Sequence, residues 1–201
     1  DFAGTAVGLA FNRQGQIRYT NGGLQIAIEN PETTGTDING DLASTENDSI
    51  ADIIGKYTFK GDWGNVSIGA VVQKVDSDVS DETGVGYSIA GKINTVGKDD
   101  IRFQLHGGQT SRYVGIVTSL GLVNGEFEDQ TAYSVSYRHF WNDSDRSSIF
   151  YGNSDTELSG RNRTQYGINY MKGLTKHLSV GVEYGRAVQD DDDVASISSD
   201  Y

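Results

Sequence analysis

The chain has 201 residues, with 16 Lys+Arg against 28 Asp+Glu, so its net charge at pH 7 is −12. This length suits one domain, which we take as residues 1–201, or part of a larger one. Only 36% of the residues are hydrophobic, and no uncharged apolar run approaches the roughly 18 residues that a membrane-spanning helix needs. The chain contains no cysteine, which excludes disulfide scaffolds and cysteine-based zinc or redox sites. An acidic chain is also a poor nucleic-acid binder unless it carries a compact basic patch.

Glycine and proline counts favour β-structure. Glycine accounts for 26 residues and proline for one, Pro31, whereas the usual glycine share is about 7%. Proline cannot donate to a β-ladder, and each interior glycine costs a helix about 1 kcal/mol. The composition therefore predicts long, continuous strands rather than helices.

Alternation of apolar and polar residues is the main local signal. The first two runs, 16–20 and 24–29, flank an Asn-Gly turn at residues 21–23 and predict a β-hairpin. The same period of two recurs along the chain. We expect ten antiparallel strands in all, and the other eight cover residues 50–59, 65–73, 85–94, 101–106, 131–141, 146–151, 166–170 and 178–184.

The expected connections alternate in length. Short ones are expected at 21–23, 60–64, 97–100, 142–145 and 172–177. Long polar ones are expected at 30–49, 74–84, 107–130, 152–163 and 187–201. Short turns on one side and long loops on the other are typical of up-and-down barrels of the bacterial outer membrane.

The apolar face of these strands contains no Asp, Glu, Lys or Arg. A charge facing lipid at mid-membrane costs roughly 2–4 kcal/mol, so this pattern favours a membrane over a soluble β-sandwich, whose strands also alternate. Trp63 and Trp141 both lie at short turns, and His139 is the titratable break beside Trp141. One aromatic girdle is expected at this end, with Tyr19, Tyr57, Phe59, Tyr137 and Tyr170.

The polar face is expected to line a water-filled lumen with a positive bias. Its acids within strands are Glu29, Asp52 and Glu183, and most other acids fall in the long loops, including Asp190 to Asp193. The bases gather near the short turns, so we expect a positive zone in the periplasmic half and an acidic outer mouth. The candidate pore-lining and anion-binding residues are Arg18, Lys56, Lys92, Arg102, Arg138 and Arg146.

Two pairs of these bases are expected on neighbouring strands, Lys92 with Arg102 and Arg138 with Arg146. Like charges this close repel unless anions or water screen them, which suggests a path for small anions. The alternative is that each base pairs with an acid from a loop or strand folded into the lumen.

Other chemistry has thin support. The histidines, His106, His139 and His177, are scattered and match no hydrolase or metalloprotease motif, so we expect no enzyme. The four consecutive aspartates lack the spacing of a calcium loop, and we assign no metal and no cofactor. We expect the acidic loops to be solvated surface, with bridging of lipopolysaccharide through divalent cations as the alternative. The apolar segment 113–123 could fold into the pore, cover the rim, form a subunit contact or be a strand that continues above the membrane.

Several short sequence segments, spread in family order over residues 10–186, resemble the DcaP-like family of trimeric outer-membrane porins. They are Arg18-Tyr19-Thr20, Leu24 to Thr34, Lys56 to Asn65, Asp99-Asp100-Ile101-Arg102, Arg112-Tyr113-Val114-Gly115 and Tyr137 to Asp143. The resemblance implies a homotrimer of roughly 16-stranded barrels that passes small anions such as dicarboxylates. Within it, Arg18, Arg102 and Arg138 are the best candidates for the basic constriction.

The ten expected strands fall short of such a barrel, and the chain ends in acidic sequence that we expect to be loop. An open sheet would leave two unpaired edges in lipid, which is not viable, so we expect an incomplete portion of a larger barrel. The leading hypothesis is a passive, anion-preferring porin in a bacterial outer membrane. The alternatives are an outer-membrane receptor or adhesin that acts through acidic loops, and a soluble β-sandwich.

Overall fold

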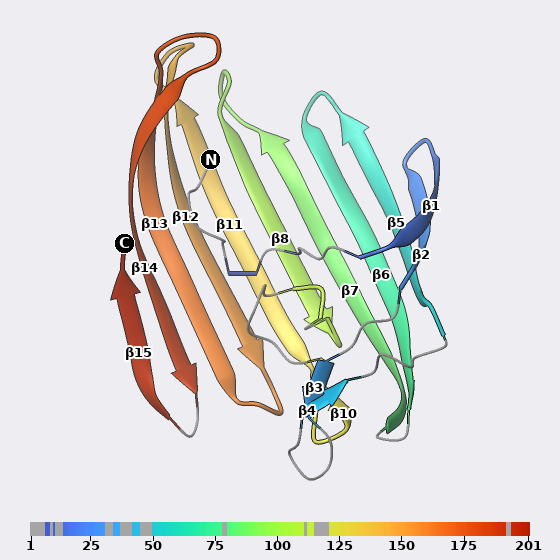
Figure 1. Ribbon diagram of the computed structural model, residues 1–201. Coiled ribbons are helices and arrows are strands. Elements are labelled where there is room, and N and C mark those ends of the chain that lie inside the picture. The colour runs from blue at the N-terminus through green and yellow to red at the C-terminus, as the bar shows by residue number, and fades with distance from the viewer. Residues whose placement is uncertain are drawn as a thin grey trace.

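The computed structural model describes residues 7–8, 10, 14–30, 34–36, 42–44, 50–77, 80–110, 112–114, 121–191 and 194–201. They form an eleven-stranded sheet in which each strand pairs with the next in chain order and every pairing is antiparallel. Its strands are β1 (Gln16–Asn21), β2 (Leu24–Glu29), β5 (Asp52–Gly61), β6 (Gly64–Ser77), β7 (Ser80–Asn94), β8 (Asp100–Gly108), β11 (Gln130–Phe140), β12 (Asp145–Thr156), β13 (Arg161–Gly173), β14 (Ser179–Asp191) and β15 (Val194–Asp200). Figure 1 shows this up-and-down order.

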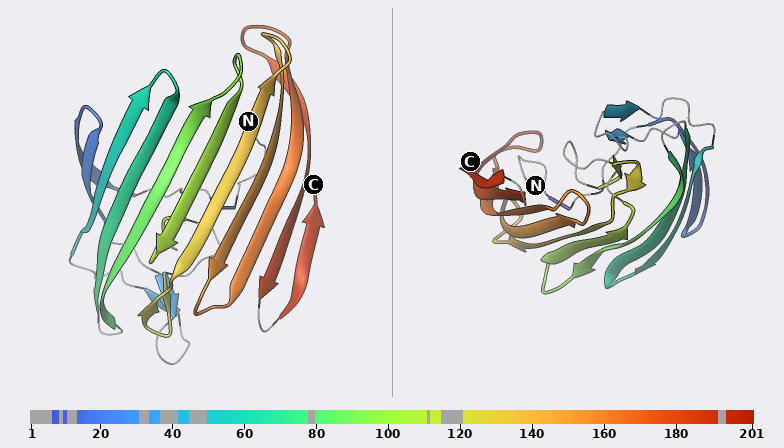
Figure 2. Two further views of the ribbon diagram at one scale, coloured as in Figure 1. Left: turned by 180° about the vertical axis from the view of Figure 1, so that it is seen from behind. Right: turned by 90° about the horizontal axis from the view of Figure 1, so that it is seen from below.

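A small second sheet lies at the end opposite the short turns. Its order is β10-β9-β3-β4, from β3 (Thr34–Thr36), β4 (Leu42–Ser44), β9 (Leu122–Val123) and β10 (Glu126–Phe127). The large sheet curves into a trough, and the small sheet lies on its concave side (Figure 2). Within the described chain, the two edge strands β1 and β15 each pair with one neighbour.

Burial is inverted relative to a soluble protein. Large apolar side chains on the convex face are exposed, among them Ile28, Ile53, Ile149, Ile168 and Val182. Polar side chains on the concave face are buried, among them Gln73, His106, Gln130, Gln165 and Asn169. A face of exposed isoleucine, valine and tyrosine suits contact with lipid, so the sheet has the pattern expected of a transmembrane barrel wall.

Aromatic side chains mark both ends of this apolar face. The residues expected near the short turns are exposed there, Trp63 and Trp141 included. The structure adds a second, more distant group that the sequence analysis missed: Tyr87, Tyr133, Tyr151, Tyr166 and Tyr184. The eight steps from Tyr133 to Trp141 cover about 27 Å along a strand, or about 20 Å across a membrane at a tilt of about 40°. These dimensions suit two interfacial girdles.

All ten expected strands are present, but three of the expected long loops are wrong. Residues 74–84, 152–163 and 187–201 mostly continue the strands β6 to β7, β12 to β13 and β14 to β15, and the chain ends in the eleventh strand rather than in a loop. Polar pairs take the place of apolar residues on the convex face of these extensions, where Lys74 pairs with Asp81 at 3.1 Å and Asn153 donates to Thr164 at 3.0 Å. The apolar pattern of the convex face stops there, although backbone pairing continues.

The long connections after β2 and β8 contain the small sheet. Among the expected loop acids, Asp192 and Asp193 lie outside the described residues, as does most of segment 113–123. In the described chain, no helix is long and apolar enough to cross a membrane.

Candidate permeation site

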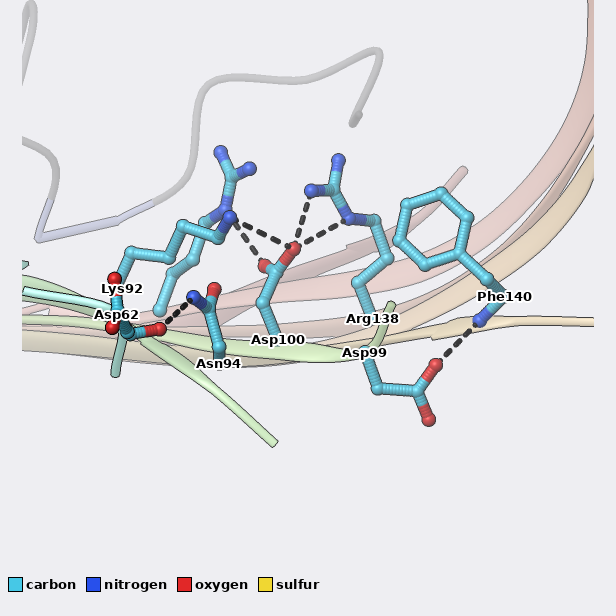
Figure 3. Close-up of polar contacts among 8 residues, drawn as sticks. Asp62, Lys92, Asn94, Asp99, Asp100, Arg138 and Phe140 are labelled. Atoms are coloured by element: carbon cyan, nitrogen blue, oxygen red, sulfur yellow. Dashed lines mark hydrogen bonds and ion pairs between the residues drawn. The ribbon is translucent and has the colours of Figure 1, made fainter. Parts of the chain in front are cut away.

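Three of the predicted bases surround one carboxylate on the concave face. Asp100, at the start of β8, is 1% exposed. It accepts a hydrogen bond from Arg102 Nε at 2.9 Å and one from Arg138 Nε at 3.1 Å, and Lys92 Nζ lies 3.9 Å away. The close-up in Figure 3 shows Lys92 and Arg138 directed toward Asp100. We call Lys92, Asp100, Arg102 and Arg138 the basic cluster.

Strand register explains why these residues meet. Lys92 lies directly opposite Arg102 across β7 and β8, and Arg138 lies directly opposite Asp100 across β8 and β11. Asp100 and Arg102 are two residues apart, so both side chains face the lumen side of one strand. The repulsion expected between Lys92 and Arg102 is therefore offset by a shared acid of the wall itself, not by an acid from a loop.

The adjacent carboxylate, Asp99, points to the opposite face (Figure 3). It accepts hydrogen bonds from Tyr137 Oη at 2.6 Å and from the Phe140 backbone N–H at 2.9 Å. His139 Nδ1 lies 2.7 Å away, and its ring meets Trp141 edge-on, with centroids 4.4 Å apart. The Tyr137 and Phe140 donors and His139 lower the pKa of Asp99 to about 2. His139, the titratable residue that interrupts the apolar face, is thus paired with Asp99 near the short turn.

The other predicted bases lie outside the basic cluster. Arg18 is exposed on β1, the edge strand. Lys56, on β5, lines a cavity of about 310 Å³. Arg146 lies directly opposite Phe140, whose ring is 4.9 Å from the Arg138 guanidinium carbon. The expected pair of Arg138 and Arg146 is therefore diagonal across β11 and β12 rather than directly opposed.

A second charged group on the concave face was missed by the sequence analysis. Arg112, in the connection after β8, contacts Asp52 on β5 through Nη1 at 2.6 Å. Tyr113 Oη donates to the same Asp52 oxygen at 2.6 Å. The Arg112 and Asp52 side chains are 5% and 0% exposed. Burial and the bond to Asp52 raise the pKa of Tyr113 above its ordinary value, so this phenol stays protonated and remains a donor.

Part of the site was visible in the sequence and part was not. Asp100 could have been predicted, because residues two positions apart on a strand face the same side and Arg102 was already expected on the lumen side. It was missed because it lies next to a turn. The pair of Arg112 and Asp52 joins residues 60 positions apart, and no local pattern signals such a contact. Among the described residues, no group of three or more His, Asp or Glu side chains is placed to hold a metal ion.

The arrangement can contact small charged solutes on the concave face. The basic cluster contains three cations and one carboxylate, lies near the short turns and faces the concave side. An antiparallel sheet with an apolar convex face and a charged concave face is the wall of a transmembrane β-barrel.

The structure is similar to that of the outer membrane channel DcaP of Acinetobacter baumannii, with a TM-score of 0.82 and 20% sequence identity. The match covers 98% of this chain and 62% of the DcaP chain. The predicted resemblance and the predicted all-β barrel fold are therefore confirmed. The exposed apolar convex face agrees with the expected location in a bacterial outer membrane. No known family model matches the sequence, and no curated protein matches it significantly.

Proposed function

We propose that this chain forms wall strands of a passive outer-membrane channel for small solutes, with a preference for anions. The observation that carries the proposal is the inverted burial of the large sheet, which exposes isoleucine, valine and tyrosine on one face and gathers cations on the other. In lipid, such a wall requires partners for the edges of β1 and β15, because unpaired backbone groups are costly there.

The basic cluster supports the preference for anions. Lys92, Arg102 and Arg138 outnumber Asp100, so the cluster has an excess of positive charge. Ammonium and guanidinium groups can replace part of the hydration of a passing anion, and several weak contacts allow its release. Small dicarboxylates fit this chemistry because two carboxylates can contact two cations at once.

Reversal potential in planar lipid bilayers under a KCl gradient tests the proposal. We expect stable conductance with anion preference, and a loss of that preference when Arg102 or Arg138 is replaced by Glu. The control is Lys176→Glu, the same charge change at an exposed turn between β13 and β14. Unchanged reversal potentials in Arg102→Glu and Arg138→Glu would contradict the assigned role of the cluster.

The alternative function, a receptor or adhesin, predicts a folded barrel without conductance. Heat-modifiable migration in gels would establish folding, and the absence of current would then favour this alternative. The proposed homotrimer is tested by chemical crosslinking of the protein in outer membranes, where a ladder ending at three subunits is expected. The proposed contact with lipopolysaccharide is tested by its co-purification, which chelation of divalent cations should reduce.

A further inference from the structure

Two segments far apart in sequence meet on the concave face: residues 112–114 after β8, and the residues described before β1, which are 7–8, 10 and 14–15 and which we call the amino-terminal segment. Ala10 and Val114 form an isolated antiparallel bridge. The amino-terminal segment also contacts the wall directly: the Val7 N–H donates to Gln165 Oε1 at 3.0 Å, and the Ala10 N–H donates to Gln104 Oε1 at 3.4 Å. The two segments therefore share one location against the inside of the trough (Figure 2).

Segment 112–114 packs closely against the wall. Val114 is 2% exposed, and the Tyr113 and Val114 N–H groups both donate to the Thr110 carbonyl, at 2.8 and 3.0 Å. A β-carbon added at Gly86 on β7 would lie 2.3 Å from Thr110 Cγ2, so a larger residue there would require the Thr110 side chain to move. A cavity of about 310 Å³ borders this segment, and its lining includes Lys56, Gln104 and His106 of the wall together with Thr110, Tyr113 and Val114.

Arg112 is the connecting point of this arrangement. Its Nη1 binds Asp52 on β5, and its Nη2 donates to Gln14 Oε1 at 2.7 Å and to the Asn30 carbonyl at 2.6 Å. Gln14 belongs to the amino-terminal segment and itself donates to Tyr113 Oη at 3.3 Å. One planar guanidinium therefore joins three parts of the chain: the wall at β5, the end of β2 and the amino-terminal segment.

We propose that Arg112 and Asp52 form a latch that holds segment 112–114 and the amino-terminal segment flat against the barrel wall and so keeps the permeation path clear. This inference rests on the proposed channel function. Without the latch, the segment loses its charged anchor to β5, and its fluctuations carry it into the path of permeating ions. The role differs from that of the basic cluster, because the latch positions a segment and need not contact the solute.

The first test is single-channel recording of Arg112→Gln. We expect brief interruptions of the open-channel current to become more frequent while the sign of the ion preference is retained. Arg112→Lys keeps the charge but lacks the planar guanidinium that donates to several acceptors at once. An intermediate frequency of interruptions is therefore expected. The matched control is Arg161→Gln, which removes another concave-face arginine whose partner, Asp191, lies at 3.8 Å and which does not anchor segment 112–114.

The second test does not depend on conduction. Hydrogen exchange of a peptide that covers residues 112–114 should be faster in Arg112→Gln than in the native protein or in Arg161→Gln. Heat-modifiable migration checks that each variant is folded. If the native protein carries no current, the proposed channel function fails while exchange still tests the latch. Exchange and interruption frequencies equal to those of the control would overturn the latch.

Discussion

At the residue scale, Asp100 shows how one side chain can tune the proposed permeation site. It is the shared counterion of Lys92, Arg102 and Arg138, and it opposes any anion that approaches them. A carboxylate about 4 Å from an anion opposes it by about 1 kcal/mol in water-like surroundings, which corresponds to about five-fold in a permeability ratio. We therefore expect Asp100→Asn to raise the anion-to-cation permeability ratio by up to about this factor.

Reversal potential under a KCl gradient measures this effect, and heat-modifiable migration verifies folding. Asp143→Asn is the control, because Asp143 is exposed in the turn after β11 and pairs there with Lys98. An unchanged or lower ratio in Asp100→Asn would show that Asp100 does not compete with permeating anions.

Asp99 provides a prediction about pH at the same scale. Its pKa in the folded protein is about 2, below the ordinary value of 3.8. A lowered pKa means that the charged form is stabilised by folding, so the contribution is present above about pH 4 and is lost as pH falls toward 2. We expect Asp99→Asn to lower stability at pH 7 and to reduce the further loss between pH 4 and 2.

Urea unfolding in lipid vesicles at pH 7, 4 and 2 checks this expectation for Asp99. Asp62→Asn is a suitable comparison because Asp62 is exposed in the turn between β5 and β6. If Asp99→Asn and the native protein lose the same stability between pH 4 and 2, Asp99 is not the group responsible.

At the scale of elements, a buried carboxylate fixes one hairpin at the far rim. Glu128 is 0% exposed and accepts from the Leu158 N–H at 2.7 Å and the Ser159 N–H at 3.0 Å. Hydrogen bonds to a charged group contribute about 1.5–3 kcal/mol each, so Glu128→Gln should loosen the turn between β12 and β13. Hydrogen exchange at residues 157–160 should become faster, whereas Glu157→Gln, at an exposed neighbouring position, should leave it unchanged.

The individual strands also show which parts of the fold could be predicted from the sequence. Alternation located every strand where one face meets lipid and the other the lumen, as at Ile149 and Tyr166. It failed at Asn153, Asn162 and Thr164, because these positions lie beyond the apolar band and polar residues take the place of apolar ones on the convex face there. It also could not place Arg112 against Asp52, since this contact depends on how a long connection folds back into the trough.

At the scale of the whole molecule, the burial of apolar and polar side chains is inverted relative to a soluble protein. This inversion distinguishes a membrane barrel from a soluble sandwich. A soluble sandwich would bury its apolar face against a second sheet, whereas here the apolar face is exposed and the small second sheet lies on the other, polar side. The concave face buries its polar groups instead, against one another and against the segments folded over them. The inverted burial thus links the fold to the proposed channel.

Lipid contact of the convex face can be tested on a single strand, β13. Ile168 is 52% exposed and lies between the two aromatic groups, whereas Asn162 lies on the same face beyond them. In lipid, Ile168→Arg should cost roughly 2–4 kcal/mol and Asn162→Arg roughly 0–1 kcal/mol, because the penalty falls with distance from the midplane. If the convex face met water, both changes would stay within about 0.5 kcal/mol, since exposed substitutions usually have small effects. Urea unfolding of the two variants in lipid vesicles distinguishes these outcomes, and equal small losses would reject the membrane-spanning wall and with it the channel.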